Sequence, residues 1–289
     1  MKAKWIIPVI SLLLILPAKA GARDQYDTLE RIIAYEKIDE LQVDIEIGIA
    51  DLTIGQAKEN NLLEADIRYN VRRGEPKISF RKSGKVGYLT IESGDKRKDY
   101  DEDRDKMSDE NWELLFTPKV PTHFDIEIGL VDAEIDLSGL KVIGFEISGG
   151  LSDIQLVFNE PNKEEIDEMS IEIGLGEFTG RKLANANFHQ LKLENGLGEV
   201  SLDLSGEWRI PEVELNLEVG LGSARVEIPE AIGIEVYKGD NFLSSVDLDR
   251  SIQKVRKGVF RTSNWDDAKR RVTIDAEVGL GSIKVKIVD

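Results

Sequence analysis

Residues 215–229 read LNLEVGLGSARVEIP, and this stretch decides how the chain folds. Apolar residues stand three and one before Gly220 and one after it, which is the alternation of a strand with one buried face. The next apolar residues stand four, six and eight after that glycine, so the alternation slips by one residue. Such a slip turns a straight strand inside out, and the chain must bend or bulge there. We therefore predict a strand, a corner and a second strand facing one core, with the residue after the glycine in the buried set.

The same pattern recurs in seven segments, each centred on a glycine. Consecutive central glycines between Gly129 and Gly220 are 21, 24, 22 and 24 residues apart. Four units carry another glycine two residues later, which would supply a positive φ at the corner. The units are 44–54, 125–137, 145–158, 170–180, 192–206, 215–229 and 274–287, with central glycines Gly48, Gly129, Gly150, Gly174, Gly196, Gly220 and Gly279.

Units of this length cannot bury a core alone and must stack on one another. The sequence therefore predicts an all-β, β-solenoid-like stack of strand–corner–strand repeats, forming a single domain over residues 21–289. Two segments interrupt the repeats. Residues 56–121 are predicted to add strands and a charged loop, and residues 239–271 are predicted to cap one end of the stack.

The first twenty residues resemble a secretory signal peptide. Lys2 and Lys4 give a basic start, residues 5–16 are mostly apolar, and Ala18 and Ala20 are the small residues of a cleavage site. The apolar run is too short to span a membrane, and no later stretch is apolar enough to do so. We predict export to the periplasm or the extracellular space, with no membrane span after cleavage.

Composition excludes several classes of function. The net charge is −17, and removal of the three lysines of the signal peptide takes it to −20. So acidic a chain is repelled by phosphate backbones, and no nucleic-acid partner is expected. The absence of cysteine excludes zinc–thiolate sites and cysteine nucleophiles.

The repeats resemble a known family. Residues 112–129 read WELLFTPKVPTHFDIEIG and residues 274–283 read IDAEVGLGSI; with the units between them they are similar to the toast-rack family. That family includes bacterial candidate-adhesin domains and the C-terminal domain of LiaF-like envelope stress proteins. The resemblance covers most of residues 30–289 and implies a non-enzymatic envelope protein, with no catalytic residue to carry over. LiaF-like proteins usually carry several transmembrane helices before this domain, where this chain has a predicted signal peptide.

No catalytic constellation is evident, and we predict neither an enzyme nor a cofactor. His123 and His189 are the only histidines and belong to different units, and neither accompanies a nucleophile motif. Gly-Leu-Gly lacks the residues of a phosphate loop. The abundance of carboxylates leaves open a polysaccharide-active enzyme of the parallel β-helix type, which would show two facing carboxylates in an aromatic-walled groove. A structural or filament-forming protein is a further alternative.

One acidic loop is a weak candidate for calcium. Positions one, three, five and twelve of an EF-hand loop carry oxygen ligands, and the chain places acids at these spacings. Arg104 stands where that loop needs glycine, so a solvated loop is the leading interpretation. The candidate ligands are Asp99, Asp101, Asp103 and Glu110.

A second acidic feature accompanies the repeats. A glutamate stands two residues before the central glycine in six units, out of phase with the buried face. If the units stack in register, these acids form a surface ladder with rungs about 5 Å apart, which cations or a basic partner would relieve. Solubility is the simpler interpretation. The six residues are Glu46, Glu127, Glu172, Glu194, Glu218 and Glu277.

The leading prediction is thus a non-enzymatic, exported cell-envelope protein, adhesin-like or associated with envelope stress. Its stacked β surface is expected to contact another envelope protein or an envelope polymer. The sequence leaves the identity of that partner and the oligomeric state open.

Overall fold

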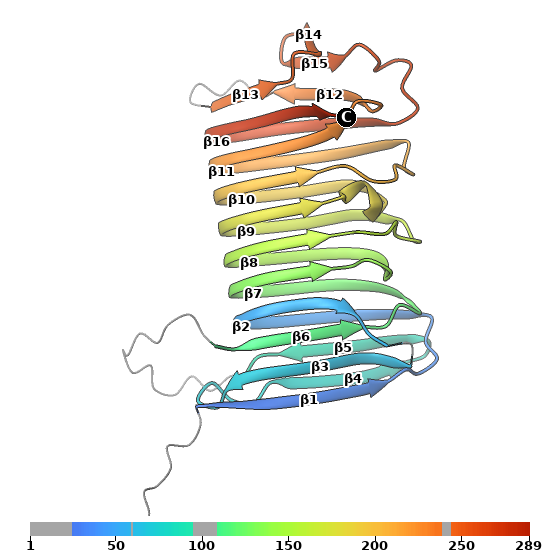
Figure 1. Ribbon diagram of the computed structural model, residues 1–289, viewed down its shortest axis with the longest axis vertical. Helices are drawn as coiled ribbons and strands as arrows, with labels where there is room; N and C mark the ends of the chain where they lie inside the picture. The colour runs from blue at the N-terminus through green and yellow to red at the C-terminus, as the bar shows by residue number, and fades with distance from the viewer. Residues whose placement is uncertain (1–24, 59, 95–108, 239–243) are drawn as a thin grey trace, which may run out of the picture.

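The computed structural model describes residues 25–58, 60–94, 109–238 and 244–289, which form one mixed sheet of 16 strands (Figure 1). The predicted signal peptide lies outside the described residues. Seven long strands pair in parallel, one above the other, and the predicted all-β stack of bent repeats is confirmed. They are β2 (Glu40–Gln56), β7 (Pro121–Asp136), β8 (Lys141–Val157), β9 (Ile166–Arg181), β10 (Phe188–Asp203), β11 (Glu212–Pro229) and β16 (Arg271–Val288).

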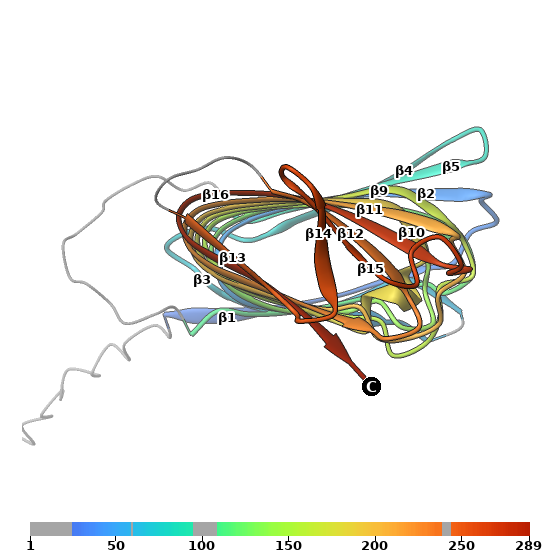
Figure 2. The same ribbon diagram turned by 90° about the horizontal axis from the view of Figure 1, so that it is seen from above.

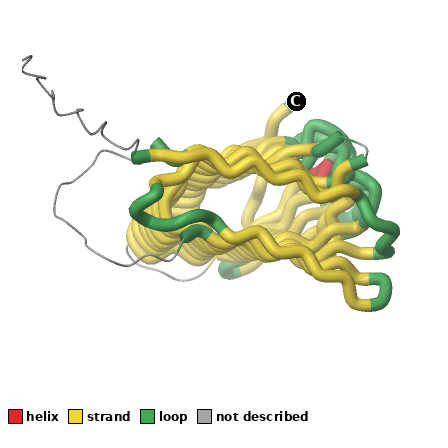
Figure 3. The backbone as a smooth tube through the Cα atoms, turned by 90° about the horizontal axis from the view of Figure 1, so that it is seen from below, coloured by secondary structure: helices red, strands yellow, loops and turns green. Residues whose placement is uncertain are grey.

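Each long strand bends near its middle, so that its two halves lie on opposite faces of a flattened stack. Figure 2 shows the bends superposed along one edge, and Figure 3 shows the loops gathered along the other. The inward side chains of both halves form one hydrophobic cluster that runs the length of the stack. Phe116 and Phe124 meet edge to face inside it, with ring centroids 5.1 Å apart.

The corner differs from the sequence prediction in one respect. The residue after the central glycine was predicted to face the core, and this is wrong: Leu221 is 49% exposed. Gly220 and Leu221 both point outward, while Val219 before them is buried. The slip in the alternation therefore falls before the leucine, between it and the glycine, whereas the sequence pattern placed the slip after the leucine.

Stacking of the corners requires glycine at the centre of each unit from the second one onward. A Cβ on Gly220 would lie 2.5 Å from the carbonyl oxygen of Gly196 beneath it, and the other central glycines from Gly129 onward meet the preceding one at 2.4–2.9 Å. In the last four units the second glycine has φ between 141° and 151°, which side chains rarely adopt. The glycines are thus needed for close approach of successive backbones.

The loop edge is closed by buried amides. The Asn162 side chain accepts a hydrogen bond from the Val142 backbone N–H and donates to the Val142 and Ala186 carbonyl oxygens, at 3.1, 2.7 and 3.1 Å. Asn185, in the short helix η1 (Leu183–Ala186), donates to the Phe158 carbonyl oxygen. Buried amides of this kind satisfy backbone groups that leave the sheet. No helix formed by the described residues is long and apolar enough to cross a membrane.

Both ends of the stack finish in half-length strands that turn antiparallel. At the N-terminal end, β5 and β6 pair with the two halves of β2, and β4, β3 and β1 continue antiparallel from them. At the C-terminal end, β12 and β13 pair with the two halves of β16, and β15 and β14 follow antiparallel.

Protection of the ends by these strands stays a prediction. Their bounds are β1 (Tyr26–Ala34), β3 (Asn61–Asn70), β4 (Lys77–Ser83), β5 (Val86–Glu92), β6 (Asn111–Phe116), β12 (Gly233–Lys238), β13 (Ser244–Leu248), β14 (Ile252–Arg256) and β15 (Val259–Thr262).

Two matched substitutions test the stacking constraint. Gly220→Ala places a methyl group against the Gly196 carbonyl oxygen and is expected to lower the free energy of unfolding by about 2–3 kcal/mol. Among the described residues, Gly48→Ala, at the same place in the first unit, meets only the Ser93 hydroxyl, at 3.7 Å. It should change the free energy of unfolding by less than about 0.5 kcal/mol. Urea denaturation measures both. Equal losses in the two variants would contradict the steric role of the stacked corners.

Candidate functional site

The corner residues combine into a continuous apolar edge. The residue after each central glycine pairs in register with its counterpart in the next unit, from Ile49 to Leu280. Six of these seven are leucines exposed by 37–51%, and glycine on one or both sides leaves them unshielded along the strand. We call this set the leucine edge: Leu130, Leu151, Leu175, Leu197, Leu221 and Leu280.

Glutamates border the leucine edge on one side. They stand two residues before the central glycines and are exposed in all six units that carry them. Strand register places each opposite the same position of the next unit, and Ser148 is the one interruption. Within the described part of the chain, no Lys or Arg forms an ion pair with them. These are the six glutamates singled out in the sequence, Glu46, Glu127, Glu172, Glu194, Glu218 and Glu277.

Acids also border the other side of the edge, three residues after the central glycine. Asp132 lies in register between Asp51 and Asp153. Burial, and then the charges of Asp153 and Asp51, raise the pKa of Asp132 above its ordinary value. Glu177 and Glu199 continue this row, and the backbone N–H of Glu177 donates to the Asp153 carboxylate at 2.9 Å. The apolar edge is therefore flanked by negative charge on both faces of the stack.

The calcium candidates are only partly described. Asp99, Asp101 and Asp103 lie outside the described residues. Glu110 is buried, and its carboxylate lies 2.8 Å from the Arg73 guanidinium. Burial raises the pKa of Glu110, and Arg73 opposes that shift. Among the described residues, no group of three or more Asp, Glu or His side chains is arranged to hold a metal ion.

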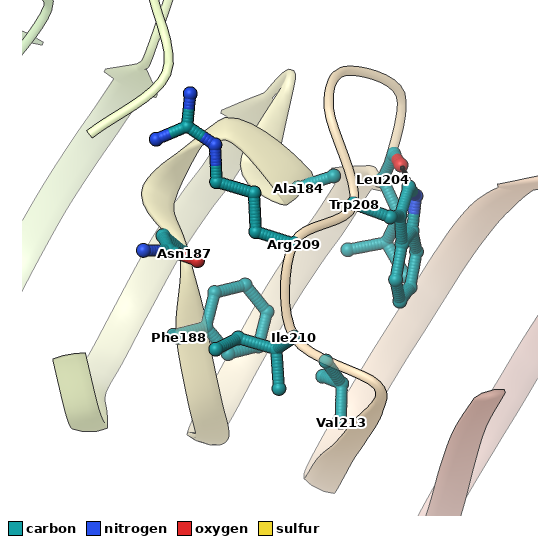
Figure 4. Close-up of a pocket in the computed structure, with 8 residues that line it drawn as sticks. All are labelled: Ala184, Asn187, Phe188, Leu204, Trp208, Arg209, Ile210 and Val213. Carbon is teal, nitrogen blue, oxygen red and sulfur yellow. Dashed lines mark hydrogen bonds between the residues drawn. The ribbon is translucent and has the colours of Figure 1, made fainter. Parts of the chain in front are cut away.

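Two hollows lie among the described residues near the loop edge and the N-terminal end, and neither is lined by a pair of facing carboxylates. One, beside the loop edge, has a volume of about 10 Å³, room for roughly one water molecule. Figure 4 shows its apolar walls, with the Arg209 side chain directed away from Phe188 and Ile210. The other, about 280 Å³ and open, is lined by residues 25–28 and Arg68 and has Asp27 as its one carboxylate.

The two histidines are far apart in the stack. His123, in β7, lies 3.8 Å from Glu146, and His189, in β10, lies 3.1 Å from Glu165. Each is thus near a surface carboxylate: Glu146 lies in β8, and Glu165 immediately precedes β9. They are not brought together.

The leucine edge is a surface feature that sequence reasoning missed. A signal for it exists: leucine occupies this position in six units, whereas isoleucine and valine dominate the positions before the glycine. β-Branched residues suit the interior of a sheet, while a run of leucine beside glycine marks a different environment. The arrangement can bind an elongated partner that is apolar at its centre and basic at its borders.

The raised pKa of Asp132, caused first by burial and then by repulsion from Asp153 and Asp51, predicts a pH-dependent stability. Because the pKa of Asp132 is raised in the folded chain, its ionisation costs stability once the pH exceeds the pKa in the unfolded chain. We expect Asp132→Asn to raise Tm by about 1–3 °C at neutral pH, and the gain to vanish below about pH 4.

The control for this prediction is Glu134→Gln on the same strand. Glu134 is also exposed, but its neighbours in register are Thr53 and Gln155, which carry no charge. Its Tm should stay within about 1 °C of the parent at both pH values. Thermal melts by circular dichroism provide the comparison. A gain of equal size in both variants, or a gain that persists in acid, would argue against repulsion along the border.

The chain is similar to several solved structures at low sequence identity. A candidate cell adhesion protein from Clostridium sporogenes aligns with a TM-score of 0.48 and 19% identity, covering 91% of this chain and 100% of that one. A candidate adhesin from Bacteroides fragilis aligns with a TM-score of 0.38 and 9% identity, covering 90% and 97%. No curated protein matches the sequence significantly.

A family model supplies the assignment. The model described as the N-terminal domain of toast_rack, DUF2154, matches residues 22–181, which is more than half of the 289 residues. The matched range contains the first four bent units and the strands at the N-terminal end. The resemblance drawn from the sequence is confirmed, and the chain belongs to the toast-rack family.

Proposed function

We propose that this protein is a non-enzymatic, exported, adhesin-like component of the cell envelope. Its stacked β surface binds another envelope protein or an envelope polymer. The observation that carries the proposal is the leucine edge, a row of exposed leucines that a monomer without a partner would gain nothing by displaying.

The remaining support comes from the repeat architecture and the N-terminal sequence. A rigid stack in which every layer repeats the same surface presents an extended binding face, the usual way in which repeat proteins act. Residues 1–20 have the composition of a cleavable secretory signal, which would deliver that face to the envelope. Membership of the toast-rack family agrees with such a role.

Export is tested by expressing the full chain in a bacterium with a C-terminal tag. We expect the tagged protein in the periplasmic or extracellular fraction, with a new N-terminus at Gly21 by mass spectrometry. As a control, Leu13→Arg and Leu14→Arg together interrupt the apolar run and should leave uncleaved protein inside the cell. Uncleaved parent protein in the cytoplasm would refute the exported role.

Binding is tested with the exported protein carrying a fluorescent label. Purified peptidoglycan sacculi and detergent-solubilised envelope proteins from the same bacterium are the two probes. We expect saturable retention on at least one of them, with displacement by excess unlabelled protein. Retention that grows linearly with concentration on both probes, or none at all, would contradict a binding role.

A further inference from the structure

We infer that the leucine edge docks an amphipathic α-helix of a partner protein, with an apolar stripe bordered on both sides by Lys or Arg. The inference rests on the proposed binding function and names the chemistry of the partner. It is carried by three properties of the edge: its length, its repeat distance and the charge beside it.

The length of the edge suits a helix. Successive layers of a parallel sheet lie about 4.8 Å apart, so the row from Ile49 to Leu280 extends for about 29 Å. A helix of about 19 residues has the same length. A helix lying along the stack could therefore contact every layer.

The repeat distance also favours a helix over an extended segment. One helical turn rises about 5.4 Å, close to one layer of the stack, so each leucine can insert between side chains of successive turns. Side chains on one face of a β-strand recur every ~6.8 Å and fall out of step with the layers after the second one. The rise of one helical turn exceeds the spacing of the layers by only about 0.6 Å, so the apolar stripe of a helix stays close to the leucines from one layer to the next.

Charge selects the partner. Four units have an acid on both sides of the edge, among them the unit of Leu175, where Glu172 and Glu177 stand on either side. Lys and Arg can lay their alkyl stems over the leucines and place their charges among these acids. In a coiled coil, opposite charges beside an apolar seam choose the partner in the same way.

The same charges disfavour other occupants of the edge. Two copies of this chain brought edge to edge would oppose acid to acid along the whole contact, with a formal charge of −17 on each. Anionic membranes and nucleic acids are repelled for the same reason. A second copy and a zwitterionic membrane are therefore treated as alternative outcomes of the experiment below.

The experiment uses the exported protein and three synthetic 20-residue peptides. The first has leucines at i, i+3, i+4 and i+7 with lysines and arginines beside them; the second has the same composition in scrambled order; the third has glutamates in place of the basic residues. Fluorescence anisotropy should show saturable binding of the first, and binding weaker by about tenfold or more for the other two. Equal binding of the ordered and scrambled peptides would overturn the inference.

Matched variants locate the site. Leu175→Ser with Leu197→Ser removes two exposed leucines from the middle of the edge and should weaken binding about tenfold while the far-UV spectrum stays unchanged. Ile32→Ser with Val255→Ser removes two exposed apolar residues of β1 and β14, away from the edge, and should leave binding unchanged. Equal effects of the two variants would exclude the edge as the docking site.

Reversal of charge gives an independent readout. Glu194→Lys with Glu218→Lys should weaken binding of the basic peptide and strengthen binding of the acidic one.

Two further measurements test the other occupants. Sedimentation shows whether the parent protein dimerises and whether the leucine variant abolishes the dimer. Binding to phosphatidylcholine vesicles shows whether the edge binds neutral lipid. Either result would replace the helix as the occupant of the edge. If the leucine variant keeps its retention on sacculi or envelope proteins, the docking inference fails while the binding function stands.

Discussion

The whole structure depends on close approach of one backbone to the next at the corners. A bent strand can stack in register on another bent strand only if no side chain stands between the two backbones at the corner. The carbonyl oxygen of each central glycine lies where a Cβ on the central residue of the next unit would be. This requirement fixes the register of both halves of every strand. Register in turn decides which side chains form the core and which form rows on the surface.

Rows form on the surface because in-register parallel strands place equivalent positions of successive units directly above one another. Apolar side chains, carboxylates and glycines each line up along the stack, so a property that is weak in one unit becomes a stripe in seven. The cost is repulsion between like charges, which adds to burial in raising the pKa of Asp132. The chain keeps these charges beside its most exposed leucines, and a basic partner would offset the repulsion.

The sequence predicted the bent units well because the slip in alternation recurs with its glycine. It could not place the slip correctly, since a glycine has no side chain to show on which side of the strand it lies, and Leu221 was therefore assigned to the core. The glutamates two residues before the central glycines could be assigned to the surface from their place in the strand alternation alone. Glu110 is different: the spacing of nearby acids suggested a loop ligand, while its actual neighbour Arg73 comes from a turn 37 residues earlier, and sequence distance carries no information on such a contact.

The split layers at the two ends of the stack have a consequence for how long the molecule can become. β4 and β14 pair antiparallel with their neighbours and carry charges such as Lys82 and Arg256, which is the arrangement expected to discourage addition of another bent strand. With the ends protected as predicted, the length of the stack would be set by the number of units in the chain and not by assembly. Duplication of one unit adds about 4.8 Å, or roughly three residues of helix. The length of the stack can therefore change only in steps of one unit, and the contacts between neighbouring units stay the same at each step.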